Sequence, residues 1–278
     1  MKLRLDALMV SRNLVASRSQ AESYIRLGKV RIRENSGILE DEISRNFDAA
    51  TKEKFAKNSW KKIEKPGFFV RDNVEIRLDV DEQFVSRAAL KLKSVAENLD
   101  VNFANKTVLD IGSSTGGFTE FALSRGAKKV FAVDVGTNQL SRKLREDPEI
   151  FSRIELHEKT DVRDFMPNDP TEKIDLVLAD VSFISLKKLL PAVIEKLQNN
   201  FAKNAEFILM VKPQFETDFR EKHLTKGIVK NETERREIFR EFEIFAKKYF
   251  LIQAKKDSDV TGAHGNRERF YKMKIITK

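Results

Sequence analysis

The sequence predicts an α/β protein built on a mostly parallel sheet whose last strand runs antiparallel, preceded by a small α+β domain. Two observations support this fold class. From about residue 86 onward, short apolar runs alternate with amphipathic segments of helical length, as in parallel sheets with crossover helices. One apolar run ends in an acid and a glycine-rich turn, from Val108 to Thr119, as in Rossmann-like nucleotide-binding domains.

The composition limits the classes of protein that fit. The 278 residues carry a formal net charge of +9, which suggests nucleic acid as the partner, ahead of an acidic membrane surface. The absence of cysteine excludes disulfides and cysteine nucleophiles, including those that methylate C5 of pyrimidines. The three histidines show no metal-ligand spacing, so no metal is expected. Because no run approaches the ~20 apolar residues of a membrane span and no signal peptide is evident, we expect a cytoplasmic protein.

Residues 1 to about 33 predict a compact basic unit. Ser19 to Glu22 has the pattern of a capping box, so a helix is expected to begin there and to end at Gly28. Val30 and Ile32 alternate with arginines and predict a short strand. Basic side chains outnumber acidic ones in this segment, which favours a phosphate-binding face over a merely solvated surface. The residues expected to bind RNA on that face are Arg4, Arg18, Arg26, Lys29, Arg31 and Arg33.

This segment resembles the RNA-binding S4 domain. The motif R-L-D…S-R…A…I…G-x-V of that domain is matched by Arg4-Leu5-Asp6, Ser17-Arg18, Ala21, Ile25, Gly28 and Val30. A charged, polar stretch of about residues 34–64 replaces the usual Asn-Gly turn, and we interpret it as an insertion in a hairpin. The motif resumes at residues 65–68 and in an alternating strand at 74–78. The resemblance implies an S4-like domain over residues 1–79, a linker over 80–85 and a second domain over 86–278.

The second domain is expected to begin with a helix capped by Ser86. Strands are expected at Thr107–Leu109, Val130–Val133, Ile174–Ala179 and Phe207–Val211. The helices between and after them are expected at Phe118–Ser124, Gln139–Arg145, Leu186–Gln198 and Glu232–Tyr249. Two further strands, Phe250–Ala254 and Glu268–Ile276, are expected to close the chain as a hairpin.

The glycine-rich turn points to a methyl donor as the ligand. Its spacing, D-x-G-x-S-T-G-G, differs from the GxGxxG of dinucleotide-binding domains and has the form expected for S-adenosylmethionine; a turn without a ligand is the competing interpretation. Asp134 ends the next strand, where a carboxylate accepts hydrogen bonds from ribose hydroxyls. Asp161 either contacts the adenine of the cofactor or is an acidic loop residue without a role in binding. The cofactor-binding residues expected are Asp110, Gly112, Ser114, Gly116, Gly117, Phe118, Asp134, Asp161 and Asp180.

Charged residues directly follow four of the predicted strands, namely Asp110, Asp134, Asp180 and Lys212. Because ligands of such sheets bind beyond the carboxyl ends of the strands, these side chains should meet at one edge. The segment after Asp180 lacks the Pro-Pro tetrapeptide of methyltransferases that modify amines. A hydroxyl acceptor instead needs a base, and Lys212 is the candidate. A second ammonium, from Lys91, would help to keep that base neutral. If the last strand runs antiparallel, Glu268 would face Lys212.

The second domain resembles the FtsJ-like RNA ribose 2'-O-methyltransferases, whose mark is a Lys-Asp-Lys-Glu tetrad. The tetrad maps onto Lys91, Asp180, Lys212 and Glu268. With the S4-like domain, the chain resembles the TlyA family of bacterial ribosomal RNA methyltransferases. The resemblance implies methyl transfer from S-adenosylmethionine to a ribose 2'-hydroxyl of ribosomal RNA or ribosomal subunits, by a monomer. Lys212 would be the base, Asp180 would orient it and the ribose, and the other two residues would tune charge and position.

Two other classes compete with this interpretation. Members of the TlyA family have also been called hemolysins, which would make the protein secreted or membrane-active. The lack of an evident signal peptide, membrane span or amphipathic pore segment argues against that class. The second alternative is an RNA-binding protein whose methyltransferase fold has lost its activity, and the intact tetrad argues against it.

Overall fold

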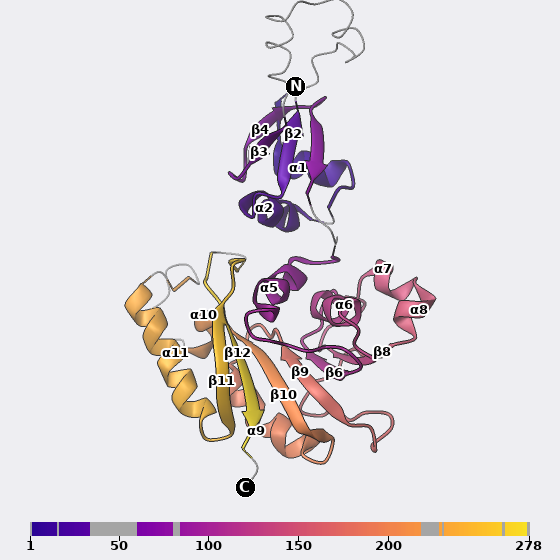
Figure 1. Cartoon of the computed structure of the whole chain (residues 1–278), viewed down its shortest axis with the longest axis vertical. Helices are drawn as coiled ribbons and strands as arrows, with labels where there is room; N and C mark the ends of the chain where they lie inside the picture. The colour runs from indigo at the N-terminus through magenta and orange to yellow at the C-terminus, as the bar shows by residue number, and fades with distance from the viewer. Residues whose placement is uncertain are drawn as a thin grey trace, which may run out of the picture. The chain divides into compact units, whose positions relative to one another are not determined.

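The computed structural model divides the chain into two compact units, residues 1–83 and 84–278, which we describe separately (Figure 1). It describes residues 2–15, 17–33, 60–79, 84–217, 228–229, 231–262 and 265–276. The division between the units falls within the linker expected at residues 80–85. Most of that linker and most of the expected insertion at 34–64 lie outside the described residues.

Unit 1 combines two helices with short antiparallel strands. Its elements are β1 (Lys2–Arg4), α1 (Leu5–Ser11), α2 (Arg18–Arg26), β2 (Val30–Arg33), β3 (Lys61–Ile63), β4 (Phe69–Arg71) and β5 (Glu75–Leu78). Strand β1 pairs with β4, and β2 lies between β3 and β5. The side chains of Leu5, Tyr24 and Ile25 are buried and form part of the core of this unit.

Helix α2 begins earlier than the sequence pattern indicated. Its N-cap is Ser17, whose hydroxyl accepts a hydrogen bond from the backbone N–H of Gln20 at 3.2 Å. The capping box expected at Ser19 was therefore misplaced, because Ser17 and Gln20 have the same spacing two residues upstream. Gly28 follows the helix as expected, with a φ of 65° that favours glycine.

The described part of unit 2 forms a seven-stranded sheet in the order β11-β12-β10-β9-β6-β7-β8. Strand β12 runs antiparallel to both neighbours, and the other neighbouring pairs are parallel, which confirms the predicted α/β fold. The strands are β6 (Thr107–Ile111), β7 (Lys129–Val133), β8 (Ile154–His157), β9 (Ile174–Ala179), β10 (Phe201–Val211), β11 (Phe250–Asp257) and β12 (Arg269–Ile275). The helices are α5 (Arg87–Ala96), α6 (Gly117–Ser124), α7 (Arg142–Arg145), α8 (Pro148–Phe151), α9 (Leu186–Leu197), α10 (Pro213–Glu216) and α11 (Glu232–Ala246).

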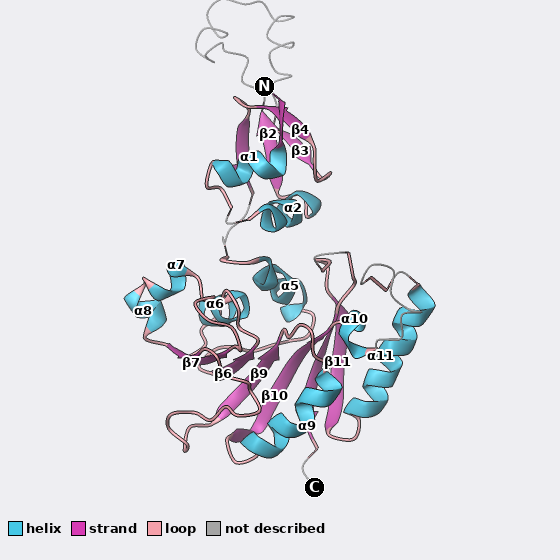
Figure 2. Cartoon of the chain, turned by 180° about the vertical axis from the view of Figure 1, so that it is seen from behind, coloured by secondary structure: helices cyan, strands magenta, loops and turns pink. Residues whose placement is uncertain are grey.

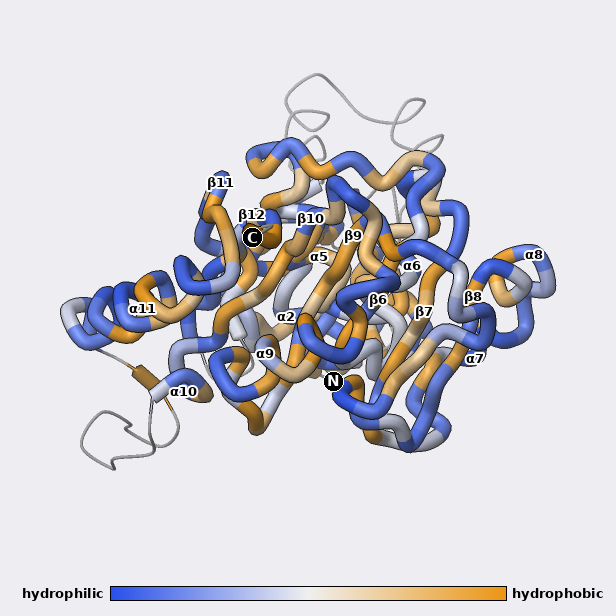
Figure 3. The backbone as a smooth tube through the Cα atoms, turned by 90° about the horizontal axis from the view of Figure 1, so that it is seen from below, coloured by the Kyte–Doolittle hydropathy of each residue, from blue (hydrophilic) through white to orange (hydrophobic). Residues whose placement is uncertain are grey.

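Helices cover both faces of this sheet, α5 and α6 on one face and α9 and α11 on the other (Figures 1 and 2). Strands buried on both faces must be apolar along most of their length, and the central strands are largely hydrophobic (Figure 3). Phe131, Val177 and Leu209 at their centres are fully buried. The core therefore holds the carboxyl ends of the strands, and the residues that follow them, in fixed positions.

Several elements differ from their expected bounds. Strand β8 was not predicted, and its Ile-Glu-Leu-His sequence is only partly apolar. Strand β10 begins at Phe201 rather than Phe207, and its first half contains polar residues and a shift in register before Glu206. Helix α7 is shorter than expected at its start, and α11 ends at Ala246.

Candidate active site

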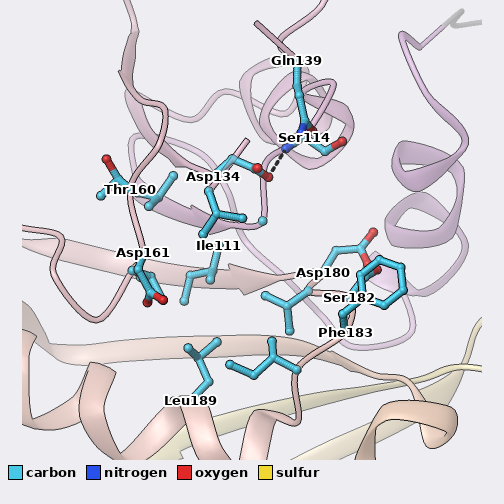
Figure 4. Close-up of a pocket in the computed structure, with 16 residues that line it drawn as sticks. Ile111, Ser114, Asp134, Gln139, Thr160, Asp161, Asp180, Ser182, Phe183 and Leu189 are labelled. Atoms are coloured by element: carbon cyan, nitrogen blue, oxygen red, sulfur yellow. Dashed lines mark hydrogen bonds between the residues drawn. The ribbon is translucent and has the colours of Figure 1, made fainter. Parts of the chain in front are cut away.

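The loops after β6, β7, β8 and β9 line a pocket of about 460 Å³ (Figure 4). This volume lies within the range of sites for small molecules and cofactors. The pocket is lined by five of the residues expected to bind the cofactor, namely Gly112, Ser114, Asp134, Asp161 and Asp180. It is also lined by residues that the sequence analysis did not single out, among them Gln139, Thr160, Ser182 and Phe183.

Gly112 brings the glycine-rich turn into contact with the loop after β9. Its φ of 79° is one that side-chain-bearing residues rarely adopt. A Cβ atom at this position would lie 2.9 Å from the backbone carbonyl oxygen of Asp180. The two loops can therefore approach each other this closely only with glycine at residue 112.

Three carboxylates line the pocket, and two of them, Asp134 and Asp161, lie on the part of the wall away from Lys212 (Figure 4). Asp134 accepts hydrogen bonds from the backbone N–H groups of Ser114, at 2.9 Å, and Gly136, at 2.7 Å. Asp161 accepts two hydrogen bonds from the guanidinium of Arg163, at 2.9 and 2.5 Å, and this partner lowers the pKa of Asp161. The wall thus offers acceptor oxygens to a ligand that carries hydroxyl or amino groups.

The other residues expected to bind the cofactor, Asp110, Gly116, Gly117 and Phe118, do not line the pocket. Asp110 lies inside β6 rather than after it, so that part of the prediction was wrong. Its buried carboxyl group accepts a hydrogen bond from Thr119 Oγ1 at 2.6 Å, and burial raises the pKa of Asp110 to about 7. The ring of Phe118 packs 6.0 Å from that of Phe270, centroid to centroid. These four residues belong to the glycine-rich turn and its flanks but do not contact the pocket.

The four residues of the expected tetrad form two ion pairs. Lys212 Nζ lies 2.6 Å from Asp180 Oδ1, and Lys91 Nζ lies 2.5 Å from Glu268 Oε2. All four side chains are largely or fully buried. The register of β10 and β12 places Val211 opposite Arg269, and Lys212 and Glu268 are the next residues along the two strands. The two pairs therefore lie at the same edge of the sheet.

The antiparallel register of β10 and β12 brings Glu268 to the position opposite Lys212, as expected. Its carboxylate nevertheless pairs with Lys91 rather than with Lys212. The ammonium of Lys91 is therefore balanced by a carboxylate of its own. Lys212 has a second partner, because its ammonium donates a hydrogen bond to Ser182 Oγ at 2.8 Å. Ser182 was not singled out from the sequence, although it lies two residues after Asp180.

A buried carboxyl group connects the two loops that carry Lys212 and Asp180. Glu216, at the end of α10, accepts hydrogen bonds from Ser185 Oγ at 2.6 Å and from the backbone N–H of Leu186 at 2.7 Å. The side chain is buried, and burial raises the pKa of Glu216. Ser185 is the N-cap of α9, so Glu216 fixes the segment after β9 to the segment after β10.

An aromatic ring lies exposed at the mouth of the pocket. Phe183 is 87% exposed and lines the pocket, and its φ of 66° is strained for a residue other than glycine. Its ring lies 5.3 Å from that of Phe215, which in turn lies 5.9 Å from Lys212 Nζ. An exposed apolar ring with a strained backbone at the edge of a pocket is a feature that ligand binding explains better than folding does.

The basic residues expected to bind RNA in unit 1 are only partly free. Four of them form ion pairs within the unit: Arg4 and Arg18 with Asp6, Arg31 with Asp79, and Arg33 with Glu75. Two of these acidic partners, Glu75 on β5 and Asp79 after it, lie beyond residues 1–33, so acids further along the chain balance part of the basic surplus of that segment. Among the described residues, Arg26 and Lys29 have no ion-pair partner, and both are exposed.

Residues 84–274 match the family of FtsJ-like methyltransferases. TlyA of Campylobacter jejuni, a 23S rRNA (cytidine-2'-O)-methyltransferase, is 41% identical over 198 residues, which cover 70% of this chain and 73% of the relative. TlyA of Mycobacterium tuberculosis, a 16S/23S rRNA (cytidine-2'-O)-methyltransferase, is 36% identical over 217 residues, covering 77% of this chain and 68% of the relative. A solved structure from Streptococcus thermophilus, described as a candidate hemolysin, is 31% identical with a TM-score of 0.65, covering 100% of this chain and 89% of that one.

The sheet order, the pocket at the carboxyl ends of its strands and the family match together define a methyltransferase of the FtsJ-like class. Within this class, the chain belongs to the TlyA family. Among the described residues, no helix has the length and apolar character needed to cross a membrane.

Proposed function

We propose that the protein transfers a methyl group from S-adenosylmethionine to a ribose 2'-hydroxyl of ribosomal RNA. The observation that carries this proposal is the buried pair of Lys212 and Asp180, since Asp180 also lines the pocket. A lysine beside a small-molecule pocket provides a base for a hydroxyl acceptor. The names of the two TlyA relatives support ribosomal RNA as the substrate and the ribose as the acceptor.

The pocket suits the methyl donor in its shape and its polar groups. When bound, S-adenosylmethionine supplies an electrophilic methyl group on a sulfonium. Asp134 and Asp161 would accept hydrogen bonds from its ribose and adenine groups, as their places on the wall allow. Gly112 leaves room for a ligand to approach the backbone of the turn.

Lys212 is the general base in the proposed reaction. Once its Nζ has lost a proton, Lys212 would accept the proton of the 2'-hydroxyl as that oxygen bonds to the methyl carbon, whose bond to sulfur breaks so that a neutral thioether leaves. Asp180 and Ser182 hold Nζ in place, at 2.6 and 2.8 Å, and the carboxylate stabilises the ammonium that results. The pair of Lys91 and Glu268 supports the site from the neighbouring strand end. Most of the rate enhancement would come from the alignment of the reacting atoms.

Phe183 provides the surface for the acceptor nucleotide. Its exposed ring at the pocket mouth offers a face on which a base can stack while the ribose reaches Lys212. The 2'-hydroxyl itself distinguishes RNA from DNA at this site. Unit 1 would add affinity through phosphate contacts, for which Arg26 and Lys29 are available, since both are exposed and neither has an ion-pair partner among the described residues.

The test compares Lys212→Ala with wild type in an assay with labelled S-adenosylmethionine and ribosomal subunits. We expect methylation to fall by about 10²-fold or more, because general-base catalysis contributes about that much. The affinity for S-adenosylmethionine should change little, since Lys212 does not line the pocket. Lys203→Ala is the matched control, because Lys203 is an exposed lysine of β10, the strand that leads to Lys212. Normal methylation by Lys212→Ala would exclude this lysine as the base.

A further inference from the structure

Strands β1 and β4 of unit 1 form a two-stranded sheet with one solvent-exposed face. Their register places Lys2 opposite Arg71 and Arg4 opposite Phe69. Opposite residues of an antiparallel pair share a face, and so do residues two apart on one strand. These four side chains therefore lie on the same face, which we name the β1–β4 face. The residue between Phe69 and Arg71, Val70, is buried on the other side.

The β1–β4 face combines one exposed aromatic ring with three cations. Phe69 is 60% exposed, although phenylalanine is usually buried in a folded domain. Among the described residues, Lys2 and Arg71 have no ion-pair partner, so their charges remain available to a ligand. Arg4 is partly balanced by Asp6, at 2.7 Å, and by Glu22 of α2, at 3.7 Å. No acidic residue belongs to the described part of this face.

The position of Arg4 is fixed next to the exposed ring. Asp6 accepts two hydrogen bonds from its guanidinium, at 3.0 and 2.7 Å, and these bonds lower the pKa of Asp6 to about 2. The guanidinium also lies against the turn that leads into β4, where a Cβ atom on Gly67 would be 3.3 Å from Arg4 Nη2. Gly67 has a φ of 77°, so glycine is favoured here for its backbone as well. The cation and the ring thus form a preformed surface.

From this arrangement we propose that the β1–β4 face binds a single-stranded segment of the RNA substrate, with one base stacked on Phe69 and phosphates held by Lys2, Arg4 and Arg71. The proposal rests on the proposed function, because it assumes an RNA substrate. Stacking of bases on aromatic rings beside basic side chains is how proteins hold unpaired nucleic acid. The apolar area is a single ring, which is too small for a stable protein interface of at least about 1,000 Å².

This surface was not among the residues expected from the sequence, apart from Arg4. It differs from the basic residues of α2 and β2 in offering a ring as well as charge. Free cations alone bind any phosphate backbone, whereas a ring selects bases that are unpaired and accessible. The inferred preference is therefore for a loop or a strand end over a continuous duplex.

The test measures the affinity of the full-length protein for a fluorescent, unstructured oligouridylate of about 12 nucleotides, at physiological salt. Phe69→Ala should weaken binding about tenfold, since stacking contributes about 1–3 kcal/mol per base, and Phe69→Tyr should restore it. Leu251→Ala is the matched control, because Leu251 is a 61% exposed apolar residue of unit 2. Arg71→Ala should reduce the slope of log affinity against log salt by about 0.7, the value for one phosphate contact on a single strand.

The outcomes separate this inference from the proposed function. If wild type methylates ribosomal RNA and Phe69→Ala binds the oligonucleotide and the RNA as wild type does, the β1–β4 face is not the RNA surface. The inference is also overturned if Phe69→Ala weakens binding to ribosomal subunits but not to protein-free ribosomal RNA, since the ring would then contact a protein. Failure of wild type to methylate any RNA would contradict the proposed function itself.

Discussion

At the scale of single residues, the buried carboxyl group of Asp110 couples the stability of unit 2 to pH. Burial raises its pKa to about 7 in the folded protein, from an ordinary value of 3.8. The folded state therefore holds this proton more tightly than the unfolded state. The resulting stabilisation is complete below about pH 4 and is lost as the pH rises towards 7.

Asp110→Asn should remove this pH dependence. We expect the free energy of unfolding of wild type, relative to the variant, to fall by about 4 kcal/mol between about pH 4 and pH 8. Urea denaturation of both proteins across that range measures the difference. Parallel profiles for the two proteins would show that Asp110 is not protonated in the folded state.

Other single residues show which parts of the site a sequence can reveal. Asp180 and Lys212 could be predicted because each directly follows an apolar strand, and strand ends converge at one edge. The roles of Ser182, Phe183 and Glu216 depend on how two loops fold against each other. Nothing in the local pattern of apolar and polar residues encodes that contact, so these residues were missed.

At the scale of elements, Glu216 joins α10 to the start of α9 and thereby fixes the loops that carry Lys212 and Asp180. Glu216→Ala would lose the hydrogen bonds from Ser185 and Leu186 and let Lys212 move relative to Asp180. We expect kcat to fall about tenfold or more, because small misplacements of reacting groups are costly. Single-turnover methylation assays measure this, and Glu216→Gln, which keeps an acceptor oxygen, should lose less. Wild-type rates in Glu216→Ala would contradict the positioning role.

A second prediction at the scale of elements concerns the turn after β6. Gly112→Ala would place a Cβ atom against the carbonyl oxygen of Asp180 and strain a backbone with positive φ. The turn must then shift, so the affinity for S-adenosylmethionine should fall about tenfold or more, given costs of about 1–3 kcal/mol for such strain. Calorimetric titration measures the affinity. Gly265→Ala is the control, because no atom lies within 4 Å of its Cβ position although its φ is also positive. Equal affinities of the two variants for S-adenosylmethionine would show that the close approach of Gly112 to Asp180 does not matter for binding.

The elements themselves were largely predictable, for a physical reason. Strands buried on both faces must be apolar, so β6, β7 and β9 stood out in the sequence. The pairing of Lys91 with Glu268 did not, because it joins a helix at the start of unit 2 to a strand at its end. The half-polar strand β8 and the irregular start of β10 lacked the periodic pattern on which such predictions depend.

At the scale of the whole molecule, we expect the two units to have functions that can be measured separately. Each has a buried core of its own, and the pocket and the tetrad lie entirely in unit 2. Removal of residues 1–79 should therefore leave binding of S-adenosylmethionine intact and weaken binding of ribosomal RNA at physiological salt. Calorimetry and a filter-binding assay measure the two affinities. Unchanged RNA affinity would contradict the role assigned to unit 1.

The competing membrane activity also belongs to this scale, since a solved relative is described as a candidate hemolysin. We expect purified, detergent-free protein to leave red cells intact. Release of haemoglobin that depends on protein concentration would revive that interpretation, and heat-unfolded protein is the control for non-specific lysis.

The central claim is that the methyl acceptor is a ribose 2'-hydroxyl. The most direct measurement incubates isolated ribosomal subunits with the protein and S-adenosylmethionine, digests the RNA to nucleosides and identifies the methylated product by mass spectrometry. The account predicts a 2'-O-methylated nucleoside that is absent when Lys212→Ala replaces wild type. A methyl group on a base, or no methylated nucleoside from either subunit, would contradict it.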